Sequence, residues 1–186
     1  MNPLHWTFDK LYPAIRFVYE RVQGHPWFQS IDANLWMGGA PTYDRDYDFI
    51  IQEDITAVVD VRAERESDLA LFDRHGIDHM KLEVLDVLVP SPEALDAGTE
   101  FIDKHIRAGG KVLVHCAKGR GRSATMVAAY LMRYQGYDYA GARELLVNRR
   151  PLVNLQGRHQ RALESWIEKY RDQPTRGLVD NAGLTP

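Results

Sequence analysis

The chain has 186 residues, of which 45% are apolar and 10% aromatic, and its formal net charge is −3. This composition fits one globular domain with a sizeable core and argues against a second domain. A single cysteine cannot form an internal disulfide, and no apolar run approaches the roughly 18 residues of a membrane span. The early charges of Asp9 and Lys10 argue against a secretory signal. We therefore expect a soluble monomer in a reducing compartment, cytoplasmic or peripheral on a membrane.

The charges are unevenly distributed along the chain. Residues 44–103 contain 17 Asp and Glu against 5 Lys and Arg, whereas residues 104–171 contain 4 against 14. A basic half favours an anionic substrate or an anionic membrane surface, and a solvated charged face is the alternative. No repeat of aromatic and basic residues indicates base stacking, which disfavours nucleic acid as a partner.

An N-terminal extension, residues 1–30, precedes the expected main domain. Within it a helix is predicted over residues 13–22, because Ile15, Val18 and Val22 fall on one helical face. That face either packs on the domain or lies in a membrane interface.

The rest of the chain alternates strands and helices, which predicts an α/β fold over residues 31–171 followed by a flexible tail, residues 172–186. The run at residues 57–61 is apolar enough for the centre of a parallel sheet. Asp60 and Arg62, at its end, either make structural hydrogen bonds or lie beside a functional site. We expect strands at residues 35–37, 57–61, 79–85 and 111–115, and helices at residues 67–75, 92–108, 123–135, 139–148 and 156–171.

The most informative segment is Val-Leu-Val-His-Cys-Ala-Lys-Gly-Arg-Gly-Arg-Ser, residues 112–123. A strand ending at Cys116, a short loop and a helix beginning near Arg122 would aim successive backbone N–H groups at one point, which suits a phosphate dianion. Cys116 is the soft nucleophile of the chain and attacks as a thiolate. An inert cysteine at a strand end is the alternative.

The neighbouring residue types fit the same chemistry. Arg122 has a planar fork of donors that can grip two phosphate oxygens, and Gly119 and Gly121 would let the backbone take positive φ. Ser123 could donate to the sulfur when a phosphocysteine is hydrolysed. His115 would favour the thiolate from behind.

His-Cys-x-x-Gly-x-x-Arg-Ser resembles the signature of the cysteine-dependent protein tyrosine phosphatase superfamily, in its small dual-specificity branch. The segments at residues 31–41 and 124–132, and the pair Arg150-Pro151, also resemble that branch. Within it the chain is most similar to lipid phosphatases typified by the mitochondrial phosphatidylglycerophosphate phosphatase. The resemblance implies a mostly parallel twisted sheet flanked by helices, catalysis through a phosphocysteine, and, in a eukaryote, a place at the mitochondrial inner membrane.

The resemblance also implies a general acid on a loop about thirty residues before the cysteine, which places it at Asp86. Protonating the leaving oxygen requires such a group. Glu83, expected on the preceding strand, and Asp96, expected in the following helix, are alternatives.

The loop between Cys116 and Arg122, Ala117 to Gly121, would bind the substrate. Lys118 and Arg120 add two cations, which favours a phospholipid monoester such as phosphatidylglycerophosphate or a phosphoinositide. Lipid-branch relatives often have lysine directly after the cysteine, where this chain has Ala117.

Three other functions stay open: a dual-specificity protein phosphatase acting on phosphotyrosine and phosphoserine or phosphothreonine, an RNA 5′-triphosphatase, and a phosphate-binding pseudoenzyme. The histidines lack paired ligand spacing, so we expect no metal and no organic cofactor.

Overall fold

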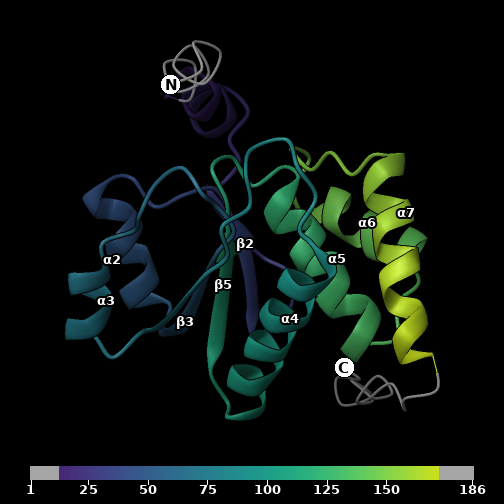
Figure 1. Ribbon diagram of the computed structural model, residues 1–186. Coiled ribbons are helices and arrows are strands. Elements are labelled where there is room, and N and C mark those ends of the chain that lie inside the picture. The colour runs from purple at the N-terminus through teal and green to yellow at the C-terminus, as the bar shows by residue number, and fades with distance from the viewer. Residues whose placement is uncertain (1–12, 172–186) are drawn as a thin grey trace, which may run out of the picture.

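A five-stranded sheet forms the centre of the molecule in the computed structural model, which describes residues 13–171 (Figure 1). The strand order is β1-β2-β5-β3-β4, in which β1 is antiparallel to β2 and the other neighbours are parallel. This confirms the predicted α/β class with a mostly parallel sheet. The strands are β1 (Phe28–Ser30), β2 (Leu35–Gly38), β3 (Ile55–Asp60), β4 (Asp78–Lys81) and β5 (Lys111–His115).

Helices cover both faces of this sheet (Figure 1). Side chains of a strand alternate between faces, so in β5 Val112 and Val114 enter one apolar core and Leu113 enters the other. Burial on both faces explains the uninterrupted apolar run that the sequence shows there. The larger core lies under α4 (Pro92–Arg107), α5 (Arg122–Tyr134), α6 (Tyr139–Arg149) and α7 (Gly157–Ile167), and the smaller one under α2 (Asp44–Gln52) and α3 (Leu69–Arg74).

The central helix is α5, whose residues from Arg122 to Met132 are all buried. It follows β5 directly and packs against α4, α6 and α7. Since both neighbours of the intervening loop are held inside the core, residues 116–121 are fixed at both ends.

Most predicted elements are present, with three differences. The strand predicted at residues 79–85 ends at Lys81, because the Val84 carbonyl accepts from Ala63 N–H and from Arg122 instead of joining the sheet. The helix predicted at residues 156–171 ends as a 3-10 turn, η2 (Glu168–Tyr170). Neither β1 nor α2 was predicted, since the first is very short and the second carries more polar than apolar residues.

The N-terminal helix is α-helical over residues 13–17 and continues as a π-helix, η1 (Val18–Val22). It docks through Arg16 and Tyr19, which are each 2% exposed, and Arg16 Nη2 lies 2.5 Å from Asp46 Oδ1. Val18 and Val22 are exposed and Ile15 is half-buried, so of the two alternatives for this face, full packing on the domain is wrong. Residues 1–12 and the predicted tail, residues 172–186, lie outside the described residues.

Candidate active site

Cys116 follows the last residue of β5, and α5 begins at Arg122. The segment from Ala117 to Gly121, called here the Cys116 loop, therefore connects the carboxyl end of a central strand to the amino end of a buried helix. This is the strand, loop and helix arrangement that the sequence predicts.

The carbonyl groups of the Cys116 loop point away from the sulfur. Each of the five accepts a hydrogen bond from outside the loop, and this turns the peptide N–H groups toward the opposite side. The donors are Ala40 N–H to Ala117 O, Arg150 Nη2 to Lys118 O, Arg150 Nε to Gly119 O, Asn154 N–H to Arg120 O and Thr125 N–H to Gly121 O, at 2.7 to 3.1 Å. The N–H groups of Gly119, in the loop, and of Ser123, in the first turn of α5, lower the pKa of the Cys116 thiol.

Arg150 is the main side chain that holds this loop, and sequence reasoning missed its role. Its guanidinium is fully buried, donates to two loop carbonyls, and also donates to Trp27 O and Gln29 Oε1. It lies 4.8 Å from the Tyr19 ring centroid, within cation–π distance. The Arg150-Pro151 pair, one of the features that carry the family resemblance, was the available signal.

Only one of the two glycine positions in the loop requires glycine. Gly119 has a φ of +67°, and a Cβ there would lie 2.6 Å from the Gly38 carbonyl carbon. Gly121 has a φ of −119°, and a Cβ there would meet nothing nearer than His159 Nε2 at 3.7 Å. Positive φ is therefore confirmed at Gly119 and wrong at Gly121, which caps α5.

The surroundings of Cys116 favour its thiolate. Burial by itself raises the pKa of this thiol, but the Arg122 charge and hydrogen bonds from Ser123 and Gly119 outweigh burial and bring the pKa below its usual value. The Ser123 hydroxyl lies 3.3 Å from the Cys116 sulfur, and both residues are buried.

Arg122 is oriented by Glu64, a residue that sequence reasoning did not select. The Glu64 carboxylate accepts from Nη1 and Nη2, each at 2.7 Å, and Val84 O accepts from Nη1 at 2.8 Å. A guanidinium has five N–H donors, so Glu64 and Val84 leave the Nε donor and the second Nη2 donor. These two donors have the fork geometry for two phosphate oxygens, and Nη2 also forms an ion pair with Asp86 Oδ1 at 3.1 Å.

The candidate acids lie in different places. Asp86 is partly exposed, and its Oδ1 lies 3.1 Å from Arg122 Nη2. Glu83 is exposed and lies beyond the end of β4. Asp96 accepts from Trp166 Nε1 and Tyr170 OH, which ties α4 to α7 and η2. Of the three, the structure brings Asp86 to the Cys116 site.

His115 lies behind the loop as a neutral side chain. Burial lowers its pKa to about 3, although Asp60 Oδ1 lies 3.8 Å from its Nδ1. It therefore adds no positive charge to favour the thiolate. Asp60 itself forms a bidentate ion pair with Arg62, at 2.7 and 2.8 Å, and this supports the structural interpretation of these two residues.

The two additional cations differ in exposure. Lys118 is half-buried and Arg120 is exposed. Within residues 13–171, no three His, Cys, Asp or Glu side chains gather as a metal site requires, and no helix has the length and apolar character to cross a membrane.

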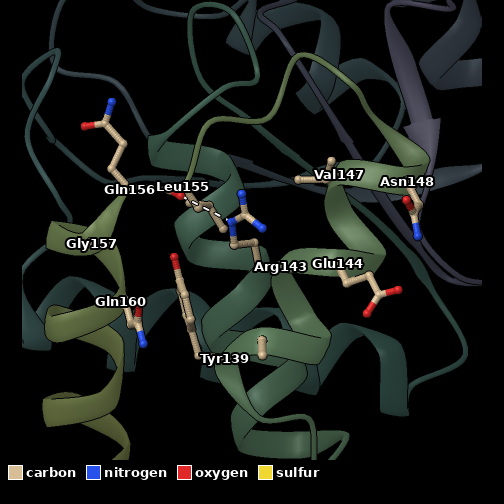
Figure 2. Close-up of a pocket in the computed structure, with 10 residues that line it drawn as sticks. Tyr139, Arg143, Glu144, Val147, Asn148, Leu155, Gln156, Gly157 and Gln160 are labelled. Atoms are coloured by element: carbon tan, nitrogen blue, oxygen red, sulfur yellow. Dashed lines mark hydrogen bonds between the residues drawn. The ribbon is translucent and has the colours of Figure 1, made fainter.

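A separate cavity of about 650 Å³ lies between α6 and the start of α7 (Figure 2). Figure 2 shows Tyr139 between the two helices and Arg143 directed toward Leu155, whose carbonyl accepts from Arg143 Nε at 3.4 Å. None of its lining residues belongs to the Cys116 loop, so this cavity is distinct from the catalytic arrangement.

A family model, the catalytic domain of dual specificity phosphatases, matches residues 35–169. The chain belongs to this family. It is thus a phosphatase of the protein tyrosine and dual-specificity type, as the sequence predicts.

Known proteins similar to this phosphatase include lipid phosphatases. The mouse phosphatidylglycerophosphatase and protein-tyrosine phosphatase 1 is 28% identical over 156 residues, which cover 78% of this chain and 81% of the mouse protein. The Arabidopsis thaliana phosphatidylglycerophosphate phosphatase PTPMT2 is 28% identical over 160 residues, which cover 84% of this chain and 68% of the Arabidopsis protein. The crystal structure of PTPMT1 in complex with PI(5)P superposes with a TM-score of 0.72 at 25% identity. The superposition covers 77% of this chain and 96% of the PTPMT1 chain.

The first prediction concerns the two glycines of the loop. Gly119→Ala should lower the free energy of unfolding by about 3 kcal/mol, because it combines left-handed backbone strain with a backbone clash. Gly121→Ala is the matched control and should change it by less than about 1 kcal/mol. Urea unfolding of both variants measures the difference, and equal effects would contradict the loop conformation described here.

The second prediction concerns the Cys116 thiolate. Ser123→Ala removes a hydrogen bond that lowers the Cys116 pKa, so the midpoint of iodoacetamide alkylation against pH should move to higher pH. The ascending limb of the curve of activity against pH should also move to higher pH, because more alkaline conditions are then needed to form the thiolate. Ser67→Ala, a buried serine bonded to Arg62 and Asp60, is the control and should leave the midpoint in place. An unmoved midpoint in Ser123→Ala would contradict the role of Ser123.

Proposed function

We propose that this phosphatase hydrolyses the phosphomonoester of a phospholipid headgroup, such as phosphatidylglycerophosphate or a phosphoinositide, at the surface of a membrane. The observation that carries the chemistry is the position of the Cys116 sulfur, which is surrounded by loop N–H groups. Arg122 and Asp86 form an ion pair beside it. The substrate class is supported by the activities for which the similar proteins are named and by the cations Lys118 and Arg120.

In the first step the Cys116 thiolate attacks phosphorus, and the bond from phosphorus to the headgroup oxygen breaks. The loop N–H groups and the Nε and Nη2 donors of Arg122 bind the three equatorial oxygens throughout this in-line transfer. Glu64 keeps the Arg122 plane fixed, so little reorganisation is needed as charge develops. Asp86 donates its proton to the leaving alkoxide.

In the second step a water molecule attacks the phosphocysteine, and Asp86 accepts a proton from that water. The bond from phosphorus to sulfur breaks and returns the electron pair to Cys116. Ser123, whose hydroxyl is 3.3 Å from the sulfur, donates a hydrogen bond to the leaving thiolate. Inorganic phosphate leaves, and the site is restored. His115 contributes by its packed position behind the strand end and not by charge.

The third prediction tests these roles. Cys116→Ser should abolish turnover and still bind vanadate, because the loop and Arg122 remain. Asp86→Asn should lower kcat/KM, which reports the first step alone, by about 10²-fold or more for an alkyl phosphate and much less for p-nitrophenyl phosphate, whose leaving group needs no proton. Glu83→Gln is the matched control and should behave as the wild type. Equal losses on the two substrates in Asp86→Asn would assign the acid to another residue.

The fourth prediction ranks the substrates. Phosphatidylglycerophosphate in vesicles and several phosphoinositides should be hydrolysed with a higher kcat/KM than phosphotyrosine and phosphothreonine peptides, with Cys116→Ser as the blank. Arg120→Gln should lower kcat/KM for a headgroup with two phosphates by about fivefold, since one cation near an anionic surface contributes about 1 kcal/mol. Arg74→Gln, on the far helix α3, should have no effect. A preference for peptides would favour the protein phosphatase function instead.

A further inference from the structure

Large exposed apolar side chains are concentrated in two short segments of the described chain. One set, the helix patch, consists of Phe17, Val18 and Val22, which are 61%, 44% and 69% exposed. The other set, the loop patch, consists of Leu85, Val87 and Leu88, which are 58%, 67% and 52% exposed. Among the described residues only Tyr43 and Leu69 are comparable elsewhere.

Both patches belong to segments that contact the catalytic arrangement. The loop patch surrounds Asp86, whose carboxylate is 3.1 Å from Arg122. The helix patch lies on the helix of Tyr19, whose ring packs against the Arg150 guanidinium that holds the Cys116 loop. Figure 1 shows the N-terminal helix and the loop before α4 projecting from the same edge of the sheet.

The helix patch is a surface of its helix that the domain leaves uncovered. Arg16 and Tyr19 form the docked side, through the ion pair with Asp46 and contacts with Trp27. Phe17, Val18 and Val22 lie on the remaining sides, so docking the helix buries the Arg16 cation and the Tyr19 ring and leaves these three apolar side chains exposed. This is the reverse of what a helix stabilised by apolar packing alone would do.

The loop patch carries backbone strain as well as exposed apolar surface. Val87 has a φ of +63°, a conformation that β-branched residues rarely adopt. Strain and exposed apolar groups at one position beside a site indicate a functional constraint.

The charges around the two patches favour an anionic surface. Arg21 is exposed between Val18 and Val22, and Lys118 and Arg120 lie on the Cys116 loop. The nearby acids Glu20 and Asp86 are paired with arginines. The exposed carboxylate of Glu83 works against binding to an anionic surface.

We infer that the helix patch and the loop patch together form a docking surface for an anionic phospholipid bilayer, with the Cys116 loop between them. Apolar side chains that enter the boundary of headgroups and acyl chains, beside cations that bind anionic headgroups, are the usual elements of interfacial binding. The inference rests on the proposed function, because a phosphate at the bilayer surface is reached only by a site that faces that surface.

The test measures binding of the full chain to vesicles by cosedimentation, with phosphatidylcholine alone and with added phosphatidylglycerol. The wild type should bind the anionic vesicles more tightly. The double variant Phe17→Ser with Val22→Ser, and separately Leu88→Ser, should each weaken that binding by about tenfold. Leu69→Ser, an exposed leucine on α3, is the matched control and should bind as the wild type.

Hydrolysis of p-nitrophenyl phosphate separates docking from folding and chemistry. The double variant should keep its rate on this soluble substrate and lose rate on a lipid phosphate in vesicles. Wild-type binding in the variants, or an equal loss in Leu69→Ser, would overturn the docking surface. A dimer that the double variant makes monomeric, without vesicle binding by the wild type, would also overturn it and assign the helix patch to a second copy. Vesicle binding without lipid hydrolysis would instead defeat the proposed function and leave the docking surface standing.

Discussion

The Cys116 loop depends on one constraint, which is that its carbonyl groups must be satisfied on the side away from the sulfur. A peptide unit has opposed donor and acceptor ends, so an anion site built from N–H groups requires acceptors on the outside to be paired elsewhere. Arg150 meets much of this need with a single buried side chain, which also reaches the segment before β1 and the N-terminal helix. The geometry at the sulfur is thus set by residues that never contact it.

The electrostatics of the site follow from burial opposed by local charge. Cys116 is buried, which disfavours a thiolate, and the adjacent guanidinium and hydrogen bonds reverse that preference. Arg122 is itself buried and is compensated by Glu64 and Asp86. The same carboxylates therefore keep a buried cation stable and determine which of its donors remain available to a phosphate. His115 is excluded from this balance because it is neutral.

The buried and the exposed apolar residues of the molecule lie in different places. The buried α5 and the two cores on either face of the sheet hold the strand ends in place. The apolar residues that the domain leaves exposed gather on the N-terminal helix and on the loop of Asp86. This division fits the proposed function, because an active site for a substrate embedded in a bilayer must lie at the contact surface and still be rigid.

Local sequence pattern was enough to predict the apolar strand of residues 111–115, the helix beginning near Arg122, the candidate nucleophile Cys116 and the general class of fold. These follow from hydrophobic period, turn residues and functional groups within a dozen positions. The tertiary structure alone decided which distant residues complete the site, such as Glu64 on Arg122 and Arg150 on the loop. It also decided that Gly121 needs no positive φ, that His115 is neutral, and that Arg16 and Tyr19 dock the first helix. Those outcomes depend on burial and on partners far apart in the chain, and local pattern contains no information about either.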